Sequence, residues 1–117
     1  MSYGPFDLKD FQHEVRNWSN ANFGVDQPSI FPLLGIGEEL GELNHAHLKG
    51  EQGIRYSYQE VQEKKKDAIG DMVIYLADYC AREGLNLEQC ISDAWSEVRT
   101  RNWAENPIDA HKQSEES

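Results

Sequence analysis

The stretch from residue 67 to 81, DAIGDMVIYLADYCA, constrains the fold more than any other part of the chain. From Ala68 to Ala81 its only charged residues are Asp71 and Asp78. A surface helix carries a polar face, whereas a helix that is apolar nearly all round is covered on both faces. The stretch therefore predicts a central helix with a buried Asp71 and a core stripe formed by Ile69, Met72, Val73, Leu76 and Cys80.

Helix start and stop signals divide the rest of the chain into similar segments. The expected helices cover residues 7–21, 29–49, 58–83 and 87–103. Ser57 and Glu60 have the spacing of a capping box, and Asn86 repeats that signature with Gln89. Gly50 and Gly84 are expected to end the second and third helices.

No strand alternation is visible, so the sequence predicts an all-α fold, most simply a bundle of about four helices. The length of 117 residues suits one domain, which we expect over residues 1–103. Residues 104–117 contain too little apolar surface to pack and are expected to form a mobile tail.

The composition limits the partners. A formal net charge of −10 argues against nucleic acid as a ligand, because phosphate backbones attract basic surfaces. No long apolar run or basic leader is visible, so we expect no membrane span and a cytoplasmic location. An acidic chain of this kind either holds cations or is simply well solvated.

The acidic residues of the second expected helix are crowded. Glu38, Glu39 and Glu42 lie within five residues and occupy one sector of that helix. Two helices joined by a short loop commonly pack antiparallel, which would bring Glu39 and Glu42 opposite Asp71, with Asp67 one turn away. An oxygen-only cluster of this kind suits Mg²⁺ or Mn²⁺. An arginine from another helix is the alternative partner for Asp71.

Three glycines interrupt these acidic segments. Gly37, Gly41 and Gly70 each lie inside an expected helix, where glycine costs about 1 kcal/mol relative to alanine. We expect them to allow close approach of a backbone or of a bulky ligand.

The order of these residues, EELGEL followed by DAIGDMVIYL, resembles the MazG-like all-α nucleoside triphosphate pyrophosphohydrolases. That family carries E-x-x-E on one helix and E-x-x-D on the next. Glu39 and Glu42 match the first motif, Glu38 completes its longer E-E-x-x-E form, and Asp71 matches the end of the second. The glutamate of E-x-x-D falls on Ala68, and Asp67 precedes that position by about 100° of helix.

The resemblance implies hydrolysis of an NTP or dNTP between the α and β phosphates, with Mg²⁺, or Mn²⁺ in its place. It implies Glu39, Glu42 and Asp71 as metal ligands, and Glu38 as a further ligand or the base that orients water. Either Asp67 supports a second ion through a shifted geometry, or the site binds one ion fewer. A homodimer or homotetramer is expected, both from the resemblance and from the apolar third helix.

The sequence indicates substrate-binding residues less specifically than it indicates the carboxylates. Lysine and arginine side chains could bind phosphate, and aromatic side chains could contact the base. The candidates are Lys49, Lys64, Arg99 and Arg101 for phosphate, and Tyr75 and Trp18 for the base.

Two other classes of protein remain open. Glu42 and His45 form a Glu-x-x-His pair, which a di-iron bundle uses twice, but Asp10 with His13 is a poor second pair. An acidic helical module that binds a protein partner would explain the net charge. It would not explain the charges embedded in an apolar helix.

Overall fold

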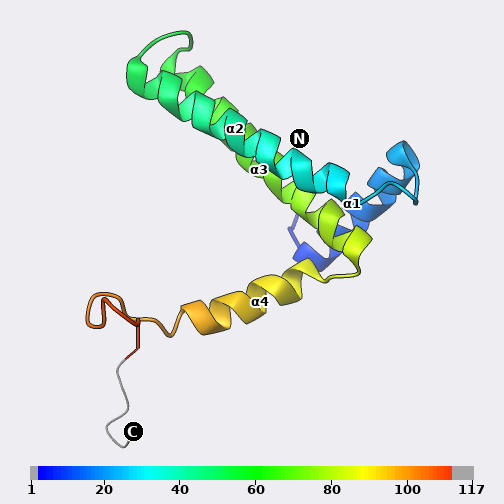
Figure 1. Ribbon diagram of the computed structural model, residues 1–117. Helices are drawn as coiled ribbons and strands as arrows, with labels where there is room; N and C mark the ends of the chain where they lie inside the picture. The colour runs from blue at the N-terminus through cyan, green and yellow to red at the C-terminus, as the bar shows by residue number, and fades with distance from the viewer. Residues whose placement is uncertain (1–2, 112–117) are drawn as a thin grey trace, which may run out of the picture. The chain divides into compact units, whose positions relative to one another are not determined.

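The structure is a computed structural model that describes residues 3–111, and over that range the chain is all-helical without strands (Figure 1). The predicted all-α class is therefore confirmed. The helices are α1 (Leu8–Phe23), α2 (Ile30–Gln52), α3 (Tyr58–Glu83) and α4 (Leu87–Val98). No helix in the described part of the chain is long and apolar enough to cross a membrane.

Local capping determines where α1 begins and where α3 begins and ends, and the caps of α3 are the predicted ones. The Asp7 side chain accepts a hydrogen bond from the Asp10 amide at the start of α1. Ser57 and Glu60 form both hydrogen bonds of the capping box at the start of α3. Gly84 ends α3 in the left-handed conformation, with φ of 71°. Each of these caps satisfies backbone groups that the helix leaves unpaired.

The predicted end of α2 at Gly50 is wrong. The helix continues to Gln52, and Gly53 takes the left-handed conformation with φ of 68°. Gly50 has a packing role instead, since a Cβ at this position would lie 3.0 Å from Cγ1 of Val61. The glycine allows α2 and α3 to approach closely just before the connection between them.

The predicted extension of α4 to residue 102 or 103 is also wrong, because the helix ends at Val98. The Asn102 amide donates to the carbonyl of Ala110 at 2.6 Å, so it does not continue the helical ladder. Residues 104–111 of the predicted tail form turns, and residues 112–117 lie outside the described residues.

The contacts divide the chain into two compact units, Met1–Leu87 and Glu88–Ser117. In the first unit α3 packs along α2 and also against α1. The α2–α3 pair is an antiparallel hairpin, as predicted (Figure 1). At one end Ser29 donates to Glu83 at 2.5 Å, and at the other Gly50 meets Val61.

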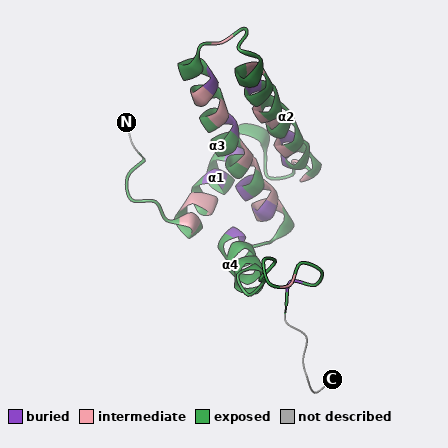
Figure 2. Ribbon diagram, turned by 90° about the vertical axis from the view of Figure 1, so that its left-hand side faces the viewer, coloured by how far each residue is buried: buried purple, intermediate pink, exposed green. Residues whose placement is uncertain are grey.

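The predicted core stripe of α3 is wrong for the isolated chain. Ile69, Val73 and Leu76 are 52%, 36% and 39% exposed, and among the stripe residues Cys80 is buried, at 4%. The buried apolar positions of α3 are Val61, Ala68, Ala77 and Cys80 (Figure 2). Neighbouring helices cover those positions, whereas the sector that contains Ile69 faces solvent in a single chain.

A buried polar network joins α1 to α3. Arg82 Nε donates to Asp78 Oδ1 at 2.9 Å, and Ser19 Oγ donates to Asp78 Oδ2 at 2.8 Å. Arg82 also donates to the carbonyls of Gly24 and Gln27, which lie in the α1–α2 connection. The carboxylate of the apolar stretch that pairs with an arginine is therefore Asp78, and its partner Arg82 belongs to the same helix.

Candidate functional site

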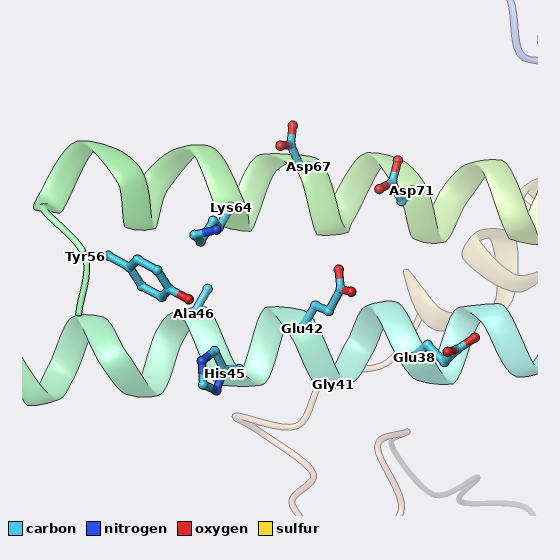
Figure 3. A pocket seen from close by; sticks show the side chains of 9 residues that line it. All are labelled: Glu38, Gly41, Glu42, His45, Ala46, Tyr56, Lys64, Asp67 and Asp71. Atoms are coloured by element: carbon cyan, nitrogen blue, oxygen red, sulfur yellow. The ribbon is translucent and has the colours of Figure 1, made fainter. Parts of the chain in front are cut away.

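A cavity of about 650 Å³ lies along the α2–α3 hairpin, on one of its sides (Figure 3). Residues one turn apart on α2 and on α3 line it, together with one residue of the connecting loop. The lining residues are Glu38, Gly41, Glu42, His45 and Ala46 of α2, Tyr56 of the loop, and Lys64, Asp67 and Asp71 of α3. Side chains on the same face of a helix recur every three or four residues, which explains this spacing.

Four of the five predicted carboxylates open onto this cavity: Glu38, Glu42, Asp67 and Asp71. Our expectation that Asp71 would be buried is wrong, because its side chain is exposed in the single chain. The side of α3 that carries Asp71 borders the cavity, and α2 covers the neighbouring sector. Asp67 and Asp71 share the cavity because residues four apart lie on one face of a helix.

Glu39 differs from its neighbours because it lies half-buried on the side of α2 that faces α3. Its Oε2 atom is inaccessible to solvent and accepts no hydrogen bond from any residue between 3 and 111. Burial raises the pKa of Glu39 from 4.5 to about 6. A hydrogen bond with Glu42 and the charges of Glu42, Asp71 and Glu38 add to this shift. A hydrogen bond between two carboxyl groups requires a proton on one of them, so this contact favours the protonated form of Glu39.

Tyr75 belongs to the same cluster. Burial raises the pKa of its phenol, and the charges of Glu39, Glu38, Asp71 and Glu42 add to that shift. Its ring lies directly against the backbone of Gly35, where a Cβ would be 2.6 Å from Cε1 of Tyr75.

The expected role of the other glycines in backbone approach is wrong. A Cβ at Gly37, Gly41 or Gly70 would meet no described atom within 4 Å. Gly35, to which sequence reasoning gave no role, is the position beside the carboxylates where the packing of α2 against α3 requires a glycine. Gly41 lines the cavity, so its role in ligand clearance stays a prediction.

The donor chemistry of the cluster fits a hard divalent cation, since all of its ligating atoms are oxygens. The repulsion between Glu39 and the neighbouring carboxylates also fits a cation site, because a bound cation would neutralise their charges. Within residues 3–111, however, no three acidic, histidine or cysteine side chains are close enough to form a complete metal site. Binding of an ion would therefore require the carboxylates to turn toward one another.

Ala68, at the position where the resembled motif has glutamate, is 2% exposed. It lies on the same helix as Asp67 and Asp71, but α2 covers its side chain. The chain thus has a small buried residue where a further ligand is expected from the motif.

The predicted substrate-binding residues do not all lie at this cavity. Lys64 lines the cavity, and Tyr75 lies within the carboxylate cluster. Trp18 lines a separate apolar groove with Phe11, Val15 and Ile74. Lys49 bonds to Gln52 at 2.9 Å and does not line the cavity. Arg99 and Arg101 belong to the second unit, where Arg101 pairs with Glu97 at 3.0 Å.

At the hairpin end of the cavity, sequence reasoning missed Tyr56 and considered His45 only as part of a di-iron pair. The Lys64 Nζ lies 4.6 Å from the centroid of the Tyr56 ring, and His45 meets that ring edge to face at 6.3 Å. The spacing of His45 from Glu42, less than one helical turn, places both residues on the side of α2 that lines the cavity. Tyr56 offered no such signal, since only the folding of the hairpin brings this loop residue to the cavity.

The two residue pairs of the di-iron alternative, Glu42 with His45 and Asp10 with His13, do not lie around one centre. Glu42 and His45 line the cavity, whereas His13 bonds to Arg16 and lines a different cavity between α1 and the end of α3. A di-iron site needs both pairs around one centre.

A scan against protein-family models, a search of curated proteins and a search of solved structures each return no match. The chemistry of the site therefore follows from its own residues. These form a carboxylate-rich end with Glu38 and Asp71, and a hairpin end where Lys64 lies over Tyr56 (Figure 3).

Proposed function

We propose that this chain is a Mg²⁺-dependent nucleotide pyrophosphohydrolase, with Mn²⁺ as an alternative ion. It would cleave an NTP or dNTP between the α and β phosphates, releasing a nucleoside monophosphate and pyrophosphate. One observation carries the proposal: carboxylates from two antiparallel helices, Glu38 and Glu42 with Asp67 and Asp71, line one cavity that also contains a lysine. The motif resemblance to MazG-like enzymes supports the same reaction.

In this proposal Glu42, Asp67 and Asp71 hold the ion, with Glu38 and Glu39 beside them. A bound Mg²⁺ would supply neutralisation of phosphate charge and acidification of a water molecule. Glu38 opens onto the cavity and orients the attacking water. Glu38 also accepts a proton from that water as its oxygen bonds to the α phosphorus, whereas Glu39, half-buried behind the cavity, adds negative charge beside the ion. The bond from the α phosphorus to the bridging oxygen breaks, and pyrophosphate leaves.

The proposal includes a homodimer or homotetramer acting in the cytoplasm. The exposed apolar residues of α3 support assembly, since Ile69, Val73 and Leu76 follow one another at helical spacing. A contiguous apolar stripe of this kind marks an interaction site. A second copy of the same chain would cover it from the outside.

The test is incubation with a panel of NTPs and dNTPs plus Mg²⁺, with the products identified by chromatography. We expect monophosphate and pyrophosphate, and we expect Glu42→Gln and Asp71→Asn to lower turnover at least about 100-fold. Glu51→Gln is the matched control, because Glu51 lies on α2 outside the cavity. Release of orthophosphate, or unchanged turnover in both cavity variants, would overturn the mechanism.

The exposed apolar residues also favour a second candidate, a non-catalytic acidic module that binds a protein partner. Thermal unfolding distinguishes the two. A divalent-ion site gives stabilisation that grows with Mn²⁺ concentration. An acidic interaction module responds equally to Mn²⁺ and to NaCl of matched ionic strength.

A further inference from the structure

The cavity on the α2–α3 hairpin has two chemically different ends. Glu38 and Asp71 lie at one end, and Lys64 extends from α3 toward Tyr56 at the other (Figure 3). Lys64 and Asp71 are seven residues apart on one helix, which corresponds to about 10 Å along its axis. The cavity is therefore long enough for an extended anionic group to reach from the carboxylate end to the lysine.

Lys64 is the one permanently cationic side chain among the described lining residues. Although four carboxylates share its cavity, it forms no ion pair within residues 3–111. Glu60, one turn earlier on α3, accepts a hydrogen bond from the Ser57 amide in the capping box, and the charge of Lys64 makes a smaller contribution to the lowered pKa of Glu60. The ammonium group instead rests over the Tyr56 ring, 4.6 Å from its centroid. A cation–π contact occupies no hydrogen-bond acceptor, so the N–H donors of lysine that point away from the ring remain free for an anion.

The loop conformation holds Tyr56 in this place. Arg55 adopts φ of 73°, a left-handed conformation that is uncommon for residues other than glycine. The Tyr56 amide then donates to the Ile54 carbonyl at 2.9 Å, and the edge of His45 packs against the ring. Strained backbone of this kind persists where the surrounding structure demands it. The backbone of the loop therefore holds the Tyr56 ring in position under Lys64.

We propose that Lys64, supported by Tyr56, forms the subsite for the diphosphate end of the substrate, the part that leaves as pyrophosphate. This inference rests on the proposed function and adds the direction in which the nucleotide binds. The α phosphate lies among the carboxylates, and the β and γ phosphates extend toward the hairpin loop. Lysine binds phosphate as a point charge, and an unpaired one is suited to a flexible polyphosphate.

Stacking of the nucleobase on Tyr56 is the competing use of this end. The Lys64 ammonium already lies over one face of the ring, and His45 meets its edge. An anion can bind to Lys64 without displacing either contact, whereas a base on that face would have to expel the ammonium group. The observed packing therefore favours the anion.

The experiment measures binding of inorganic pyrophosphate, and separately of a nucleoside monophosphate, to the full chain by calorimetry with Mg²⁺ present. We expect Lys64→Gln to weaken pyrophosphate binding about 10- to 100-fold, the loss of one charged contact, and to change monophosphate binding less than about twofold. Lys65→Gln is the matched control, since Lys65 is adjacent in sequence but lines a different cavity. Tyr56→Phe should keep the affinity, and Tyr56→Leu should lower it.

The outcomes separate this inference from the proposed function. Selective loss of pyrophosphate binding in Lys64→Gln supports the subsite even if the chain hydrolyses no nucleotide, in which case the proposed function alone fails. If nucleotides are hydrolysed but Lys64→Gln binds pyrophosphate normally, the subsite is wrong and the function stands. Equal weakening of pyrophosphate and monophosphate, or no pyrophosphate binding by the unaltered chain, also overturns the subsite.

Discussion

The ring of Tyr75 lies against the backbone of Gly35, and this contact aligns the two helices that carry the carboxylates. Because α2 and α3 are antiparallel, one turn forward from Gly35 reaches Glu39, and one turn back from Tyr75 reaches Asp71. The same alignment explains why the charge of Asp71 contributes to the raised pKa of Glu39. A contact between a glycine and a tyrosine thus brings the two halves of the site together.

Substitution at Gly35 tests this alignment. In Gly35→Ala the new methyl group meets the Tyr75 ring at 2.6 Å, and overpacking of this kind costs about 1–3 kcal/mol. Gly37→Ala is the control, since its methyl group meets nothing within 4 Å and alanine favours a helix by about 0.5–1 kcal/mol. We expect urea denaturation to show Gly35→Ala as less stable than Gly37→Ala by at least about 1 kcal/mol. Equal stability would mean that the helices can separate without cost.

The buried pair between Asp78 and Arg82 should dominate the stability of the α1–α3 contact. Their side chains are 9% and 6% exposed, so removing one charge strands the other. We expect Asp78→Ala to lower the free energy of unfolding by about 3–5 kcal/mol. Glu97→Ala, which breaks the exposed pair with Arg101, should cost less than about 1 kcal/mol. Denaturant titration checks both, and similar losses in the two variants would contradict the assignment.

The pH dependence of the metal-free protein should report Glu39. Its pKa is raised from 4.5 to about 6 on folding, so the folded state binds the proton more tightly than the unfolded state does. This contribution to stability is fully present below pH 4.5 and is lost as the pH rises through about 6. Glu39→Gln lacks it, so the variant should gain stability relative to the unaltered chain between about pH 5 and about pH 7.5. A difference in melting temperature that does not change over this range would disprove the shift.

Ala68→Glu tests whether the altered motif limits ion binding. A carboxylate at this buried position should destabilise the metal-free protein by several kcal/mol. If the cluster holds a cation, Mn²⁺ should then raise the melting temperature of the variant by more than it raises that of the unaltered chain. Ala68→Gln has the same size without the charge and should show no such gain. Equal responses of the two variants to Mn²⁺ would place position 68 outside the ion site.

The exposed stripe of α3 predicts assembly. Ile69 lies about 160° around the helix from Asp71, so a charge introduced there leaves the cavity unchanged. We expect Ile69→Glu to shift the chain toward the monomer in sedimentation at micromolar concentration, while Lys66→Glu at the exposed preceding turn has a smaller effect. A monomeric unaltered chain would show that a second copy does not cover this stripe.

The sequence by itself determined what depends on neighbouring residues. Ser57 and Glu60 were sufficient to predict the start of α3, because a capping box acts within four residues. The acidic residues could likewise be placed on one side of each helix, since helical periodicity is local. The all-helical class followed from the same periodicity.

Only the tertiary structure decided which surfaces those helices cover. It exposed Asp71 and buried Asp78 with Arg82, although both aspartates lie in the same apolar stretch. It also required a glycine at position 35, and brought Tyr56 from the loop to Lys64. The physical reason is that burial and pairing depend on the alignment of one helix against another. That alignment is a property of contacts between residues far apart in the chain, which no local pattern specifies.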